Sequence, residues 1–202
     1  MRFGRQSGAV GCEGQFLSMP QLVEIIGFPI SAVREAVKQA SSQGLLVTLP
    51  KRGIQVMEAR PETIRECLDF RMVLDQEGAR RRVAGGALSG LEELRRHHED
   101  MLEAARGNLA EDLPPRAIKV DLSLHDYLSA GLGNSQLAAA YDANRMRIAI
   151  LQNARPFLHV RIASAMEEHL AIIGALQSGD AAAAAEAIRF HYEQTLRWWG
   201  VA

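Results

Sequence analysis

The stretch "SAVREAVKQASSQGLLVTLPKRGIQVME", Ser31 to Glu58, contains a helical pattern followed by a strand pattern. Apolar residues in its first half recur at helical spacing and stop at Gly44, so we expect a helix with Ser31 as its N-cap. The second half holds two short runs rich in β-branched residues on either side of "PKRG". This arrangement predicts a β-hairpin with a basic, glycine-containing tip.

Another helix is predicted immediately before this stretch. Ser18 is a suitable N-cap for a helix over residues 18–26, whose apolar side chains follow the helical period, and Gly27 and Pro29 end it. Helix, turn, helix and hairpin follow one another in the order of a winged helix-turn-helix. We therefore assign residues 1–58 to such a domain.

The rest of the chain, residues 59–202, is dominated by helical patterns bounded by glycine, proline or asparagine. The expected helices cover residues 62–84, 88–107, 115–130, 135–152, 155–177 and 180–199. Short connections between them favour an antiparallel arrangement. The sequence thus predicts a mainly α protein, with an N-terminal winged helix-turn-helix and a C-terminal antiparallel helical bundle of about six helices.

Composition limits the partners of the chain. Lys and Arg number 23 against 24 Asp and Glu, so no overall basic charge attracts nucleic acid, and any such binding depends on a local patch. Cys12 and Cys67 form no CxxC pair, which favours free thiols in a reducing compartment. Because we also find neither a signal peptide nor an apolar run long enough to span a membrane, we expect a cytoplasmic protein with no membrane partner.

The segment "VDLSLHDYLSAGLGN" places Asp121 and His125 four residues apart. On a helix this spacing puts a carboxylate and an imidazole on one face, where both can reach one metal ion. Such a pair is common by chance, and a hydrogen bond on the helix surface explains it equally well.

Two further histidines strengthen the metal hypothesis. His169 in "EEHLAIIGAL" and His191 in "AIRFHYEQ" both adjoin apolar stripes, where an unpaired imidazole is costly. Together with Asp121 and His125 they would form a site of three nitrogens and one oxygen, suited to a divalent metal such as Zn²⁺ or Ni²⁺. Each histidine taken alone also fits a core or surface role. We expect His97 and His98, flanked by charges, to lie on a solvated face, and His159 to stay outside the site.

Motifs in both domains resemble a known family. In the first domain they are "LVEIIGF", "SAVREAVKQASSQGLL" and "PKRGIQV". In the second they are D-x-x-x-H with a following Gly-Asn, then EH-x-x-I, Gly-Asp and a late histidine. In this order they resemble the GntR family of bacterial transcription regulators, in the subfamily with an all-helical C-terminal effector domain, the FCD domain. The resemblance covers nearly the whole chain after about residue 14.

The resemblance implies that the bundle binds a divalent metal and, beside it, a small carboxylate effector. The matching ligand positions are Asp121, His125, His169 and His191. Arg71, in "DFRMVLDQEGA", occupies the place of an arginine that lines the effector cavity in this subfamily, and Asn134 of the Gly-Asn motif is assigned to the same site. A cation beside the metal suits an anionic ligand. A solvated helix arginine is the alternative for Arg71.

The helix that would read DNA departs from the family pattern. Pro29 and Ile30 stand where the family has Ser and Arg, and Pro20 replaces a frequent arginine. "MRFGRQSG" is too short and glycine-rich to supply the helix that normally opens the domain, so either translation starts upstream or the module is degraded. The remaining candidate phosphate or base contacts are Ser31, Arg34, Lys38, Lys51 and Arg52.

Three functions are compatible with these observations. The preferred one is a metabolite-responsive transcription regulator that binds a double-stranded operator as a homodimer, since two-fold operators need two copies. The second is a metabolite- and metal-binding protein that has lost DNA binding. The third and least favoured is a metal-dependent enzyme, because Glu167 and Glu168 adjoin His169 but consecutive helix residues point in different directions, which leaves no well-placed general base.

Overall fold

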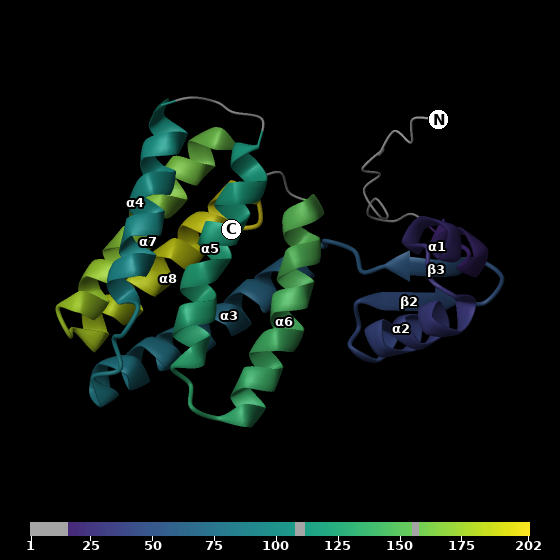
Figure 1. Ribbon diagram of the computed structural model, residues 1–202, viewed down its shortest axis with the longest axis horizontal. Coiled ribbons are helices and arrows are strands. Elements are labelled where there is room, and N and C mark those ends of the chain that lie inside the picture. The colour runs from purple at the N-terminus through teal and green to yellow at the C-terminus, as the bar shows by residue number, and fades with distance from the viewer. Residues whose placement is uncertain (1–15, 108–111, 155–157) are drawn as a thin grey trace. The chain divides into compact units, whose positions relative to one another are not determined.

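The computed structural model describes residues 16–107, 112–154 and 158–202. Its chain divides into two compact units, one ending at Arg60 and the other beginning at Pro61. Both are drawn in Figure 1, where the helices dominate and the strands are confined to the first unit. The predicted mainly α class is confirmed. No helix in the described ranges is both long and apolar enough to cross a membrane.

The first unit combines two helices with a small antiparallel sheet. Its elements are β1 (Phe16–Leu17), α1 (Met19–Ile26), α2 (Ile30–Ser42), β2 (Leu46–Leu49) and β3 (Gly53–Val56), and the sheet order is β1-β3-β2. The Ser18 cap is confirmed, because its hydroxyl accepts from the Gln21 amide while the Gln21 side chain accepts from the Ser18 amide. Gly27, in the left-handed region, ends α1 as predicted.

One local prediction in this unit was wrong, and one short strand was not predicted. Ser31 is not the N-cap of α2, because the helix already begins at Ile30 behind Pro29, whose ring holds φ at a helix-compatible −56°. No sequence pattern indicated β1, a strand of two residues that pairs with β3. That pairing requires Gly53, since a Cβ there would lie 2.7 Å from the Leu17 carbonyl oxygen.

Among the residues described, the second unit contains the six helices predicted. They are α3 (Pro61–Gly85), α4 (Leu91–Gly107), α5 (Leu113–Ala130), α6 (Ser135–Ala154), α7 (His159–Gln177) and α8 (Ala181–Trp198). α4 starts three residues later than expected, and the predicted start of the next-to-last helix at residue 155 falls outside the described residues. Helix α8 packs closely against both α3 and α7, and α4 packs against α7 (Figure 1).

Buried polar residues interrupt the core of this bundle between two apolar clusters. On α4, Leu94 belongs to one cluster and Met101 to the other, and the buried His98 lies between them. The same order occurs on α7, where Ala165 and Ile172 flank His169. Because each step follows the helical period, these polar residues face the same interior as the apolar ones. The bundle therefore encloses a polar layer.

The backbones of helices α3 and α5 approach each other closely where the two helices cross, beside this polar layer. A Cβ at Gly78 would lie 2.1 Å from the carbonyl oxygen of Leu128, far inside ordinary contact distance. Only glycine allows the two backbones to come this close. Asp75 and His125 lie one turn away on the same two helices, so the crossing sets their separation.

Candidate metal and effector site

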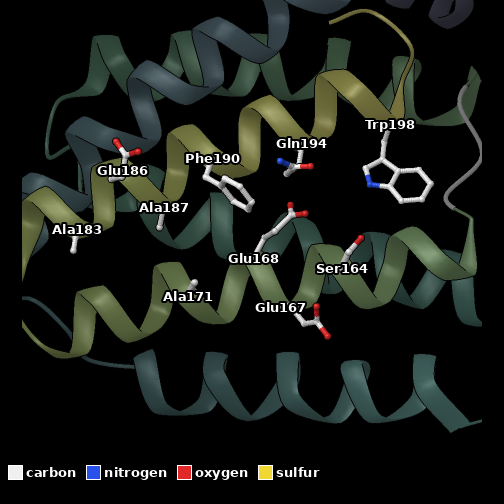
Figure 2. A pocket seen from close by; sticks show the side chains of 10 residues that line it. All are labelled: Ser164, Glu167, Glu168, Ala171, Ala183, Glu186, Ala187, Phe190, Gln194 and Trp198. Atoms are coloured by element: carbon white, nitrogen blue, oxygen red, sulfur yellow. The ribbon is translucent and has the colours of Figure 1, made fainter.

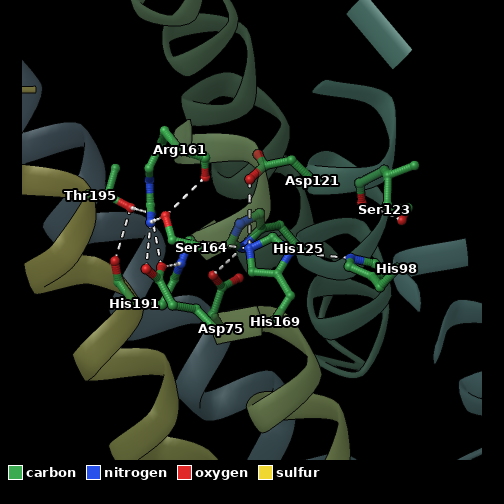
Figure 3. Close-up of polar contacts among 12 residues, drawn as sticks. Asp75, His98, Asp121, Ser123, His125, Arg161, Ser164, His169, His191 and Thr195 are labelled. Carbon is green, nitrogen blue, oxygen red and sulfur yellow. Dashed lines mark hydrogen bonds and ion pairs between the residues drawn. The ribbon is translucent and has the colours of Figure 1, made fainter. Parts of the chain in front are cut away.

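The structure brings the four predicted metal ligands together. Asp121 and His125 come from α5, His169 from α7 and His191 from α8, and each offers a ligand atom within 4.8 Å of the others. All four side chains are buried. Figure 3 shows the three imidazoles converging at one point, with the Asp121 carboxylate directed towards it.

The Nε2 atoms of the histidines face one another. His169 Nε2 lies 3.3 Å from His191 Nε2 and 3.6 Å from Asp121 Oδ1. His125 Nε2 is buried and has no hydrogen-bond partner among the described residues. Ring nitrogens brought this close need a cation or a shared proton between them.

Buried carboxylates hold the outer nitrogens of two of these rings. Asp75 Oδ2 accepts a hydrogen bond from His125 Nδ1 at 2.7 Å, and Glu168 Oε2 accepts one from His191 Nδ1 at 2.7 Å. A proton on Nδ1 leaves the Nε2 lone pair free, and partners of this kind typically orient metal-binding histidines. Two of the three histidines are thereby set with Nε2 available as a ligand.

His98 lies beside the third ring, contrary to the sequence prediction. It is fully buried, its Nε2 is 3.2 Å from His169 Nδ1, and its Nδ1 is 2.8 Å from the Leu94 carbonyl oxygen. Its charged neighbours in sequence suggested a solvated face, which holds for His97, whose side chain is half exposed. The spacing from Leu94 to His98 to Met101 was the available signal, because it places His98 on the buried stripe of α4.

Burial governs protonation in this layer. It lowers the pKa of His98 and, together with the positive charge of neighbouring imidazoles, lowers the pKa values of His169 and His191 well below the usual value. The rings are therefore neutral, which is the form that binds metals. Three imidazoles, one carboxylate and an unpartnered Nε2 on His125 fit a divalent cation. The cluster could hold a metal ion.

Arg71 points into a small cavity beside these ligands. The cavity, about 30 Å³ in volume, is lined by Arg71, Asp121, Gln152, Arg161, Ala165, His191, Thr195 and Trp199. Arg71 is only 5% exposed, yet no hydrogen bond or ion pair holds its guanidinium among the described residues. Gln152 donates to Asp121 at 3.2 Å and leaves its own buried carbonyl oxygen without a partner. The solvated alternative for Arg71 is excluded, and the cavity presents unsatisfied polar groups to a ligand.

Arg161 also lines the cavity, and Glu168 holds its guanidinium. Both Arg161 Nη atoms bond to the Glu168 carboxylate, and Nη2 also donates to Thr195 Oγ1 at 3.0 Å. Burial raises the pKa of Glu168, while Arg161 opposes this shift. The sequence argument set Glu168 aside because it adjoins His169, but the side chain instead reaches His191 on α8. Glu167 turns outwards and pairs with Arg106.

Asn134 lies away from this cavity. It is exposed, and its side-chain oxygen caps α6 by accepting from the amides of Gln136 and Leu137 at 2.9 and 3.2 Å. It lines a separate surface hollow of about 520 Å³ with Tyr141 and Arg145. Asn134 therefore does not share a site with Arg71, which corrects the prediction. Its side-chain oxygen instead caps the N-terminus of α6.

A shallow groove runs along the outer face of α7 and α8 (Figure 2). Its volume is about 690 Å³, and Phe190 and Trp198 border it with half-exposed rings. Glu168 lines this groove from one side and contacts His191 on the other. The groove is thus separated from the metal ligands by a single side chain.

The predicted DNA contacts are exposed on two elements of the first unit. Ser31, Arg34 and Lys38 are exposed on α2, whose Val33 and Val37 are buried. Lys51 and Arg52 are exposed at the tip of the β2–β3 hairpin, where Lys51 adopts a left-handed φ of 63°. Two apolar side chains are also exposed at the start of α2, Phe28 at 62% and Ile30 at 46%.

The helical unit matches a known domain family. The FCD domain family matches residues 66–194, which contain all four ligands and Arg71. None of the curated proteins matches the sequence. The fold resembles that of E. coli McbR/YncC, at 18% identity and a TM-score of 0.76, over 93% of this chain and 88% of that one.

Two further solved structures share the fold at lower similarity. Lar of Listeria monocytogenes, described as controlling expression of the agr system, aligns with 12% identity and a TM-score of 0.60 over 95% of this chain and 89% of its own. Streptococcus agalactiae GntR aligns with 18% identity and a TM-score of 0.50 over 92% and 90%. The FCD part of the resemblance drawn from the sequence motifs is confirmed by the domain match, and the chain belongs to the FCD domain family.

Proposed function

We propose that the protein is a metabolite-responsive transcription regulator whose helical unit binds a divalent metal and a small carboxylate effector. The observation that carries the proposal is Arg71, a buried guanidinium that has no partner among the described residues and lies beside four converging ligand atoms. An unpaired buried charge is unfavourable, so a structure that retains one fits a role in binding an anion. Arginine also matches the planar geometry of a carboxylate.

The metal would be held by Asp121, His125, His169 and His191. The nitrogen-rich set favours Zn²⁺ or Ni²⁺ over Mg²⁺ or Ca²⁺, which prefer oxygen ligands. Bound there, the ion would supply a second positive group for the effector's oxygens. Asp75 and Glu168 would hold the imidazole rings, and Arg71 would orient the effector.

The size of the cavity suggests how an effector acts. A volume of about 30 Å³ admits little more than one water molecule, so an organic acid fits only if the surrounding helices move apart. A ligand that requires this wider arrangement shifts the population towards it. We propose that the shift changes DNA binding by the first unit, in a cytoplasmic homodimer that presents two recognition helices to an operator.

Replacing Arg71 with methionine distinguishes a role of this side chain in effector binding from a role in the thermal stability of the protein. We expect affinity for the carboxylate that binds best among acetate, succinate and citrate to fall about 10- to 100-fold, because charge-assisted hydrogen bonds are removed. Thermal stability without ligand should stay level or rise, since an unpaired buried charge is removed. Calorimetry and thermal melts measure the two quantities, with the exposed Arg189→Met as control. Unchanged carboxylate affinity would remove Arg71 from the site.

Replacing Arg34 with alanine tests the DNA surface. The variant lacks one cation of α2 that can bind a phosphate, so its binding to promoter DNA from the protein's own gene neighbourhood should weaken and the salt slope should fall by about one. Gel shifts at several salt concentrations report both values, and the exposed Arg96→Ala on α4 is the matched control. If neither wild type nor a chain extended upstream binds in a sequence-dependent, salt-sensitive way, regulation through DNA is excluded.

The exposed apolar start of α2 favours one second candidate, a metal- and metabolite-binding protein without DNA binding. It predicts tight metal and carboxylate binding with no shift of promoter DNA. A metal-dependent enzyme is less favoured, since Glu168 is committed to Arg161 and His191. Turnover of a small carboxylate that disappears in His169→Ala would revive that hypothesis.

A further inference from the structure

His98 is a buried histidine outside the set of four ligands. It comes from α4, a helix that contributes none of them, and its ring centroid lies 5.2 Å from that of His169. Its two nitrogens are both engaged, Nδ1 with the Leu94 carbonyl oxygen at 2.8 Å and Nε2 with His169 Nδ1 at 3.2 Å. Figure 3 shows His98 at the outer end of this chain of contacts.

These contacts determine which nitrogens carry protons. A backbone carbonyl oxygen can only accept, so the proton of the neutral His98 ring is on Nδ1. His98 Nε2 is then an acceptor, and His169 must donate to it from Nδ1. His169 consequently keeps its lone pair on Nε2, the atom that faces His191 and Asp121.

We propose that Leu94 and His98 form a relay that fixes the tautomer and ring orientation of His169, which makes His98 a positioning residue for the bound metal. The inference rests on the metal binding proposed above. His98 accepts from His169 Nδ1 and so orients that ring, as Asp75 orients His125 and Glu168 orients His191.

The use of imidazole at this position has an electrostatic consequence. Asp75, Asp121 and Glu168 already place three carboxylates in the buried layer, and Arg161 is bonded to the last of them. A fourth carboxylate beside His169 would add negative charge where an anionic effector must approach. A neutral ring orients His169 without adding that charge, so the site remains suited to an anion.

Three substitutions test the relay in the full-length protein. His98→Phe keeps a ring of similar size but removes the acceptor, His98→Gln restores an acceptor oxygen, and His97→Ala changes the exposed neighbour as control. Chelator competition gives the Zn²⁺ affinity, and the visible absorption of the Co²⁺ form reports ligand number. Nitrogen-15 shifts of the histidine rings in the metal-free protein report the tautomer of His169.

The relay predicts an Nδ1–H tautomer for His169 in wild type, mixed tautomers in His98→Phe, and recovery in His98→Gln. Zn²⁺ affinity should fall about 10- to 100-fold in His98→Phe, recover at least partly in His98→Gln and stay constant in His97→Ala. An Nε2–H tautomer for His169 in wild type, or equal affinity in wild type and His98→Phe, would overturn the relay. If wild type binds no metal, the proposed function fails, while the tautomer measurement still decides the relay, even if His98→Phe does not fold.

Discussion

Replacing His125 and His191 together with alanine should leave the purified protein nearly free of metal. Wild type should carry about one divalent ion per chain, because four converging ligands bind far more tightly than the two that would remain. The two rings come from α5 and α8, so the double variant breaks the site on two sides at once. Elemental analysis after dialysis against a metal-buffered solution measures the loss, which should be at least roughly tenfold.

The control for this experiment is His97→Ala, which removes an exposed imidazole from α4. It should retain the wild-type metal content, since His97 faces Glu93 on the helix surface. Equal metal content in the double variant and in wild type would contradict the ligand assignment. It would mean that any bound ion is held elsewhere on the chain.

Replacing Gly78 with alanine should both destabilise the bundle and weaken metal binding. The added Cβ would meet the Leu128 backbone at 2.1 Å, where ordinary contacts begin at 3.4 Å, so α3 and α5 must separate by about 1 Å. Overpacking against rigid backbone costs about 3 kcal/mol of unfolding free energy. Metal affinity should fall as well, because the same displacement moves Asp75 away from His125. Chemical denaturation and chelator competition measure these effects.

Gly174→Ala is the matched control, since this glycine also lies inside a helix but has nothing within 4 Å of its missing Cβ. Alanine there should leave stability unchanged or raise it by up to about 1 kcal/mol, because it lowers the entropy of the unfolded chain. Metal affinity should not change. If Gly78→Ala had the same unfolding free energy as Gly174→Ala, this result would contradict the close approach of the α3 and α5 backbones.

The sequence predicted those parts of the fold that local patterns determine. Each of the six bundle helices was identified from apolar periodicity with its stop signals, and the Ser18 cap from a serine directly before an apolar helical pattern. The features that the sequence missed arise where a partner distant in sequence decides the outcome. Strand β1 exists because β3 pairs with it, and Gly78 is required because Leu128 lies against it.

The same distinction applies to the site. Asp121 and His125 were noticed for their four-residue spacing, and His169 and His191 for their apolar neighbours. The structure places all four together. The residues that hold them were missed because their partners lie on other helices. Asp75 on α3 contacts His125 on α5. The sequence does not indicate which residues of two different helices lie opposite each other. His98 was misjudged because its adjacent charges outweighed its place on the apolar stripe.

The proposed regulation requires that occupancy of the helical site controls DNA binding. The most direct test is the affinity of metal-loaded protein for its promoter DNA, measured by fluorescence anisotropy with and without a saturating carboxylate identified by calorimetry. We predict a change of about 5- to 150-fold in wild type, in the range of typical allosteric coupling, and no change in Arg71→Met at the same carboxylate concentration. Equal DNA affinity of wild type with the site filled and empty would contradict the account.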